Sequence, residues 1–203
     1  MSKKDKKLDP RVVRTCQLLR AALINLIPQK GFAAISIQDI TDQATLNRAT
    51  FYLHYRDKTE LLMEVFEELM AGVTPLPPEE GHPPIQPVSV SIARVFERVG
   101  QHADFFRVML AEESVPMFNA RIRQYVEDVG LKWISALQPE EDKILVPPEI
   151  AISFLGSAYL GAIVWWLQKG MPHPPDYMAN QLIQLTALGL YGSLGLETPP
   201  RLS

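Results

Sequence analysis

The sequence lacks the common signatures of enzymes, metalloproteins and secreted disulfide-bonded proteins. Its only cysteine, Cys16, excludes an internal disulfide bond and fits a reducing compartment. There is no glycine-rich phosphate loop and no Gly-x-Ser-x-Gly nucleophile turn. His82, His102 and His173 lie far apart along the chain, so we expect neither a metal site nor a cofactor.

A secretory signal is also lacking, because no apolar stretch follows the lysines near the N-terminus, and we expect a cytoplasmic protein. The net charge of −3 over 203 residues argues against general nucleic-acid binding. The charge is uneven, however: residues 1–60 hold 11 Lys or Arg and 6 Asp or Glu, which gives +5, and the remainder is −8. This pattern indicates either a polyanion-binding module on an acidic body or a solvated basic tail.

Alternation of apolar and polar residues, the pattern of a β-strand, is not sustained anywhere, and helical spacing dominates between proline-rich breaks. We predict an all-α fold of about nine helices. Six prolines within residues 74–87 are incompatible with a helix, so residues 73–87 are predicted to be a linker. The domains predicted on either side are residues 9–72 and 88–197, preceded by a disordered basic arm at residues 1–8.

Capping residues mark helix starts in the first module. Asp9 precedes a helix that begins at Pro10, Ser36 can form a capping box with Asp39, and Asn47 is a favourable N-cap. The helices of this module are predicted at residues 10–30, 37–43, 48–55 and 58–71. In the second module we expect helices at residues 88–101, 103–111, 114–137, 148–170 and 175–195.

The second and third predicted helices are short and joined by three or four residues, which is the arrangement of a helix-turn-helix. In that motif the second helix enters the major groove of DNA, and the first crosses the backbone. Arg48 can read guanine or hold a phosphate, and the methyl group of Thr50 can meet a thymine methyl. Tyr52, His54 and Tyr55 carry polar tips able to reach phosphate oxygens.

Lysines at two places in the sequence add to this interpretation. Lys58 stands at the start of the fourth helix, where free N–H groups already attract an anion. Lys3 to Lys7 are expected to add phosphate contacts from the arm. The alternative is a small packed helical subdomain, with the apolar residues Ile37, Ile40, Leu46, Phe51 and Leu53.

The first module resembles the TetR/AcrR family of transcriptional regulators over residues 10–65. The matching residues are Gly31, Phe32, Ser36, Ile37, Ile40, Tyr52, His54, Tyr55, Lys58, Leu61 and Leu62. The resemblance implies an N-terminal three-helix helix-turn-helix domain and a C-terminal helical ligand-binding and dimerisation domain. It places DNA contacts on Ser36, Ile37, Gln38, Asn47, Arg48, Ala49, Thr50, Tyr52, His54, Tyr55 and Lys58.

One position departs from the family pattern. The family usually has glycine in the turn between the two helices, where this chain has Thr45. Either the turn avoids a positive φ, or Thr45 is strained.

Two stretches without a charged residue, 150–168 and 177–196, mark the second module. Each is long enough to span a membrane, but internal polar residues and the lack of flanking Lys/Arg clusters argue against that. We predict that this helix pair packs against the same pair of a second subunit in a homodimer, with burial inside one subunit as the alternative. The predicted interface residues are Gly156, Ser157, Leu160, Gly161, Val164, Leu182, Leu185 and Leu188.

Aromatic and thioether side chains also cluster in the second module. Facing helices lined in this way can enclose a mainly apolar pocket for a small molecule, although the same spacing describes an ordinary core. The candidate pocket residues are His102, Phe105, Phe106, Met109, Phe118, Tyr125, Trp133, Phe154 and Tyr159.

Three functions fit these observations: a ligand-responsive DNA-binding regulator, a small helical enzyme, and an interaction protein that binds no DNA. The resemblance favours the first. We expect a homodimeric repressor that binds a near-palindromic double-stranded DNA operator and is released by a small, mainly apolar effector. No catalytic residue and no membrane association are expected.

Overall fold

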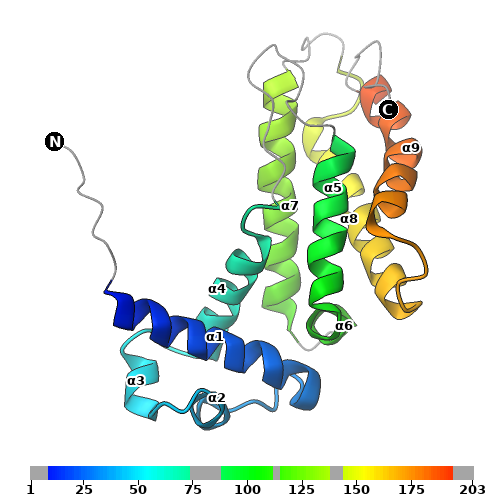
Figure 1. The fold of residues 1–203 in the computed structure, drawn as a ribbon. Coiled ribbons are helices and arrows are strands. Elements are labelled where there is room, and N and C mark those ends of the chain that lie inside the picture. The colour runs from blue at the N-terminus through cyan, green and yellow to red at the C-terminus, as the bar shows by residue number, and fades with distance from the viewer. Residues whose placement is uncertain (1–8, 74–87, 112–114, 138–143, 194–203) are drawn as a thin grey trace, which may run out of the picture. The chain divides into compact units, whose positions relative to one another are not determined.

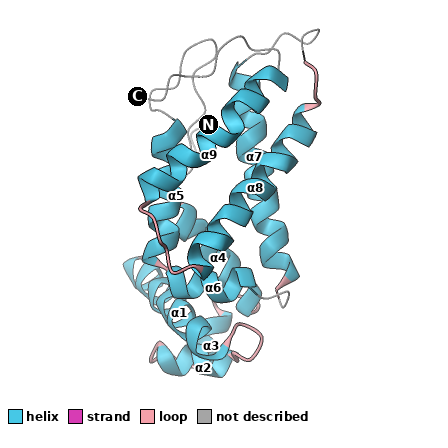
Figure 2. Ribbon diagram, turned by 90° about the vertical axis from the view of Figure 1, so that its right-hand side faces the viewer, coloured by secondary structure: helices cyan, strands magenta, loops and turns pink. Residues whose placement is uncertain are grey.

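The residues that the computed structural model describes are 9–73, 88–111, 115–137 and 144–193. They form helices joined by loops, which confirms the prediction of an all-α fold (Figure 2). The chain divides into two units, Met1–Leu69 and Met70–Ser203. The predicted basic arm and nearly all of the predicted linker lie outside the described residues, so the domain boundaries stay predictions.

The first unit contains α1 (Pro10–Lys30), α2 (Ile37–Gln43), α3 (Arg48–Tyr52) and most of α4 (Lys58–Met70). The predicted caps of the first three helices are confirmed. Asp9 Oδ1 accepts the Arg11 N–H at 2.9 Å, and Asn47 Oδ1 accepts the Thr50 N–H at 2.7 Å. Ser36 and Asp39 make both bonds of a capping box. Each of these helices therefore begins where side chains satisfy free backbone donors.

Apolar side chains from α1 to α4 fill the core of this unit. The apolar residues with no exposed surface are Leu19, Leu23, Ile27, Ile40, Phe51, Leu61, Leu62 and Val65. α2 packs against α1 and α3, and both short helices lie along one side of α1 (Figure 1). Because a helix of five residues is not stable alone in water, α3 depends on its cap and on the burial of Phe51.

The predicted end of α3 is wrong by three residues, because the helix stops at Tyr52 rather than Tyr55. The N–H groups of His54 and Tyr55 both donate to the Phe51 carbonyl at 3.0 Å, which closes a turn instead of extending the helix. Leu53 still has helical backbone angles, with φ of −71° and ψ of −20°, so the chain leaves the helical path only after this residue.

Thr45, which stands where the family usually has glycine, is in the left-handed region with a φ of 54°. Its side chain is exposed, and its hydroxyl donates to the Ala44 carbonyl at 2.7 Å. A residue with a Cβ pays roughly 1–2 kcal/mol for this conformation. Of the two alternatives for the turn, the strained one is therefore observed.

Replacing Thr45 by glycine should raise the free energy of unfolding by about 0.5–1 kcal/mol, because the released strain exceeds the added entropy of the unfolded chain. Thr45→Ala is the matched control, since it removes the hydroxyl and keeps the Cβ. Urea unfolding of both variants measures the difference. Stabilisation of equal size in both would show that the hydroxyl, not the φ angle, is responsible.

The second unit contains α5 (Val88–Gln101), α6 (Ala103–Ala111), α7 (Pro116–Leu137), α8 (Pro148–Gln168) and α9 (Pro175–Ser193). The four long helices run side by side, and α6 lies at one end of them (Figure 1). α5 packs against α6 and α9, and α8 packs against α6, α7 and α9. The largest buried side chains are Phe96, Phe105, Phe106, Met109, Phe118 and Trp166.

α8 ends at Gln168, two residues before its predicted end. Gly170 and Met171 have φ angles of 74° and 59°, and the Met171 N–H donates to the Trp166 carbonyl at 2.7 Å. Two successive left-handed residues cannot continue a right-handed helix, so the chain turns here toward α9.

Within the described residues, α8 is the helix that is long and apolar enough to cross a membrane by length and composition. Helices that lie in protein interfaces or cores pass the same test. Only 22% of the residues in its most apolar window are buried in the unit. Much of the apolar surface of α8 therefore has no cover from its own unit.

Candidate nucleic-acid interface

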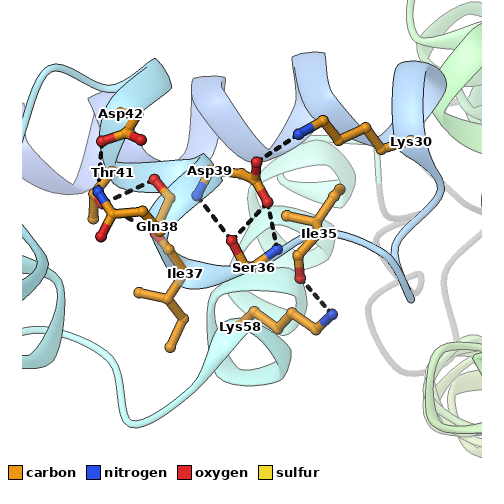
Figure 3. Close-up of polar contacts among 9 residues, drawn as sticks. All are labelled: Lys30, Ile35, Ser36, Ile37, Gln38, Asp39, Thr41, Asp42 and Lys58. Atoms are coloured by element: carbon orange, nitrogen blue, oxygen red, sulfur yellow. Dashed lines mark hydrogen bonds and ion pairs between the residues drawn. The ribbon is translucent and has the colours of Figure 1, made fainter.

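The exposed side of the α2–α3 pair carries several of the groups that were predicted to contact DNA. The exposed residues of the predicted set on these two helices are Gln38, Arg48, Ala49 and Tyr52. The half-buried ones on and directly after them are Ile37, Thr50 and His54. The Gln38 side chain is oriented by a bond from its Nε2 to Asp42 Oδ1 at 2.6 Å (Figure 3).

Arg48 and Tyr52 form a fixed pair on α3. Arg48 Nη2 lies 3.1 Å from the Tyr52 hydroxyl, and the central guanidinium carbon lies 5.6 Å from the centre of the Tyr52 ring. The Tyr52 ring stands edge-on to Phe51, with centroids 5.6 Å apart and an interplanar angle of 85°. Since Phe51 is fully buried, the core of the unit orients an exposed guanidinium.

Ser36 and Asn47 act as helix caps. Ser36 Oγ accepts the Asp39 N–H at 3.1 Å and donates to Asp39 Oδ2 at 2.6 Å (Figure 3). Asn47 Oδ1 accepts the Thr50 N–H at 2.7 Å and the Thr50 hydroxyl at 2.9 Å. Both residues are exposed, and a DNA contact by either stays a prediction.

The structure corrects the prediction for Tyr55. This residue is 3% exposed, and its ring lies 5.7 Å from that of Phe51, centroid to centroid. Burial raises the pKa of its hydroxyl well above the ordinary value, and the neighbouring Cys16 and Glu64 add to the shift. A hydroxyl enclosed in this way does not reach a phosphate, so Tyr55 belongs to the core.

Lys58 is half-buried and makes bonds within its own unit, and its predicted DNA contact stays a prediction. Its ammonium donates to the carbonyls of Phe32, Ala33 and Ile35 at 2.8, 2.9 and 2.6 Å. Figure 3 shows its side chain directed at the Ile35 carbonyl. An ammonium has three N–H donors, and all three are engaged inside the unit.

Leu53 is a surface residue that the sequence had suggested for the core. It is 79% exposed, directly after α3. Leu53 follows the exposed Ala49 by four residues. This helical spacing could have predicted that both side chains lie on the same side of α3. The thymine methyl is the apolar group of the major groove, and Leu53 has the matching chemistry.

The predicted dimer residues divide into exposed and internal ones. Ser157, Gly161 and Leu185 are exposed, and Leu160 and Val164 are half-buried. Two residues are corrected: Leu182 is 6% exposed, and a Cβ on Gly156 would lie 2.6 Å from a methyl carbon of Val126 on α7. Both therefore serve packing within the unit. The side chain of Leu188 lies outside the described residues.

The predicted ligand pocket is also corrected. Phe105, Phe106, Met109 and Phe118 are at most 3% exposed, and Phe105 packs edge-on to both other phenylalanines. Phe154, in contrast, is 69% exposed. A packed core and a surface side chain do not line one pocket. The other candidates, His102, Tyr125, Trp133 and Tyr159, are half-buried.

An open, shallow cleft of about 570 Å³ is found at a different place, between α5 and the loop that joins α8 to α9. Trp166 Nε1 donates to the His173 carbonyl at 2.7 Å and holds this loop over the end of α8. The lining residues are Phe96, Glu97, Gly100, Gln101, Trp166, Met171, Pro172, His173, Pro174 and Pro175.

Two family models match the chain. Residues 18–65 match bacterial regulatory proteins of the tetR family, and residues 89–187 match a transcriptional regulator C-terminal region. The chain belongs to the TetR family of transcriptional regulators. Members of this family are regulators and not enzymes, which removes the alternative of a small helical enzyme.

The curated relatives that match are HTH-type transcriptional regulators longer than this chain. The uncharacterized HTH-type transcriptional regulator YxbF of Bacillus subtilis (strain 168) is 26% identical over 195 residues, which cover 93% of this chain and 48% of the relative. The uncharacterized regulator YerO of the same organism is 32% identical over 114 residues, covering 54% and 39%. This chain thus spans about half, or less, of the curated relatives it matches.

Solved structures share the TetR fold over nearly the whole chain. A TetR transcriptional regulator from Streptococcus agalactiae 2603V has a TM-score of 0.66 at 21% identity, covering 87% of this chain and 95% of that one. NalD, described as the secondary repressor of the MexAB-OprM multidrug efflux pump in Pseudomonas aeruginosa, has a TM-score of 0.65 at 20% identity, covering 89% and 98%. At these identities the likeness shows the fold.

Proposed function

We propose that this TetR-family protein is a DNA-binding regulator: a homodimer that binds a near-palindromic operator and is released by a small, mainly apolar effector. The observation that carries the proposal is the exposed side of α3, where Arg48 and Tyr52 face solvent and Tyr52 packs on the buried Phe51. In a helix-turn-helix this side of the second helix meets base edges and phosphates. An arginine at this place can donate two hydrogen bonds to the O6 and N7 atoms of guanine.

A homodimer is supported by the uncovered surface of α8. Ile150, Phe154 and Trp165 are 60%, 69% and 44% exposed. Ser157 and Gly161 lie between them at helical spacing, so the five residues form one apolar, uncharged stripe. On neighbouring α9, Leu185 is 79% exposed. We propose that the same surface of a second copy covers this stripe by two-fold symmetry.

Release by an effector is supported by the cleft beside α5. Its residues combine aromatic, thioether and proline side chains with the carboxylate of Glu97 and the amide of Gln101, which suits a mainly apolar compound with one or two polar groups. The role as a repressor stays a prediction. Among the solved structures with this fold, NalD is described as a repressor and DhaS as an operon activator.

Selection of bound sequences from random duplex DNA, with the full chain, tests the proposal. We expect one two-fold-symmetric sequence, with half-sites about one helical turn or a multiple of it apart. The affinity for this sequence should fall steeply with salt concentration. A pool without enrichment would contradict DNA reading, and enrichment of a single half-site would contradict the dimer.

A further inference from the structure

Leu53 is the most exposed large apolar side chain among the described residues of the first unit. It is 79% exposed, against 48% for Tyr52 and 38% for Leu18. Its φ of −71° and ψ of −20° continue the helical backbone of α3 by one residue. The position of its side chain is therefore set by the helix, and most of its apolar surface meets solvent.

Two stripes of different chemistry lie next to each other on the exposed surface of α3. Arg48 and Tyr52, four residues apart, form a polar stripe and are joined by the 3.1 Å contact between Arg48 Nη2 and the Tyr52 hydroxyl. Ala49 and Leu53 are also exposed and four residues apart, and they form an apolar stripe. Since one residue turns a helix by about 100°, the apolar stripe directly neighbours the polar one.

We propose that Leu53 is a specificity-determining residue, which together with Ala49 packs on the C5-methyl group of a thymine in each half-site of the operator. This inference rests on the proposed DNA-binding function and names one base that is read. A leucine side chain has no donor or acceptor for a phosphate or for the polar edge of a base. The thymine methyl is the apolar group of the major groove, and its burial against Leu53 is favourable.

The geometry of helix and DNA limits where this thymine lies. Residues four or five apart on a helix are separated by about 6–8 Å along its axis, and successive base pairs by about 3.4 Å. We therefore expect the thymine within about two or three base pairs of the one that Arg48 contacts.

Thr50 carries the methyl group that the sequence had suggested for a thymine contact. In the structure Thr50 is half-buried, and Asn47 Oδ1 accepts both its N–H and its hydroxyl, at 2.7 and 2.9 Å. These bonds hold the threonine at the N-terminal cap of α3. Leu53 is the larger and more exposed apolar side chain, so we assign the thymine contact to Leu53 rather than to Thr50.

Replacing single thymines of the operator by deoxyuridine tests the contact, because it removes the methyl group and keeps the base pairing. The probe is the operator selected from random duplex DNA, and the protein is the full chain. At one thymine of each half-site we expect wild-type affinity to fall about fourfold, and about 15-fold when both are replaced, as for the loss of about one buried methyl group each. In Leu53→Ala the same replacements should change affinity less than about twofold, since the partner of the methyl is gone.

Two matched variants serve as controls. Leu53→Met keeps an apolar side chain of similar volume and should keep the fourfold loss with deoxyuridine. Thr50→Ser removes the rival methyl, keeps the hydroxyl that bonds to Asn47, and should keep the loss as well. Because Leu53 is mostly exposed, Leu53→Ala should unfold at the same urea concentration as the wild type. Its slope of log affinity against log salt should also be unchanged, since no phosphate contact is lost.

The proposal is overturned if Leu53→Ala still loses about fourfold affinity on removal of the methyl, or if no thymine of the operator responds to deoxyuridine in the wild type. Disappearance of the loss in Thr50→Ser but not in Leu53→Ala would assign the contact to Thr50. If the selection enriches no sequence, the proposed function itself fails. An enriched operator that is indifferent to the thymine methyls would remove only the role of Leu53.

Discussion

Replacing Phe154 and Leu185 together by glutamate will convert the dimer to a monomer and weaken operator binding by a factor on the order of 10²–10⁴. The two side chains are 69% and 79% exposed in the single chain, on neighbouring helices. If a second subunit covers them, each glutamate places an unpaired charge in an apolar interface. Operator affinity falls because a monomer brings only one α3 to two half-sites.

Leu145→Glu is the matched control for this double variant. Leu145 lies in the loop before α8, it is 77% exposed, and the chemical change is the same. Analytical ultracentrifugation should give twice 22.9 kDa for the wild type and for Leu145→Glu, and 22.9 kDa for the double variant. Circular dichroism checks that the helices remain. A double variant that stays dimeric would place the interface elsewhere, and a monomeric wild type would remove the homodimer from the proposed function.

Helix boundaries were predictable because the signals that set them are local. Asp9, Ser36 and Asn47 each satisfy a backbone donor within three residues, so the chain around each of them specifies a helix start on its own. Proline and the long uncharged stretches separated the helices of the second unit in the same way. The end of α3 escaped prediction, since the turn after Tyr52 depends on Phe51 being held in the core.

Side-chain directions were much less predictable. Tyr55 and Lys58 carry polar tips in a basic segment, and nothing in the sequence says whether such a tip points to solvent. Tyr55 points inward because Phe51, Cys16 and Glu64 surround it, and Lys58 because a distant loop offers three carbonyls. Phe51 is four positions from Tyr55, but the other contacts join residues 9 to 39 positions apart, so only the folded chain reveals them.

The second unit shows the same limit. Buried core and ligand pocket have the same aromatic spacing in the sequence, and Phe105 and Phe118 were indistinguishable from pocket residues until their packing was known. The lack of charge on α8 did indicate a helix whose surface is buried against other helices. The structure shows which side is still exposed in the single chain, because Gly156 faces Val126 and Phe154 faces solvent.

Replacing Arg48 by alanine is expected to lower affinity for the selected operator about 10- to 100-fold and to relax the base preference at one position of each half-site. The guanidinium is oriented before it meets DNA, since it lies on Tyr52, which in turn stands on the buried Phe51. Such preorganisation reduces the entropy lost on binding and favours one orientation of the guanidinium group. Repeating the selection experiment with the variant measures both effects.

Arg48→Lys separates base reading from charge. Lysine keeps the positive charge and loses the planar fork, so we expect the salt dependence of binding to persist while the base preference is lost. Arg94→Ala, at an exposed arginine on α5 in the other unit, should change neither property. If Arg48→Lys keeps the full base preference, Arg48 holds a phosphate and another residue of α3 reads the base. If Arg48→Ala binds and selects DNA like the wild type, Arg48 does not contact the major groove. The exposed side of α3 would then no longer support the proposed function.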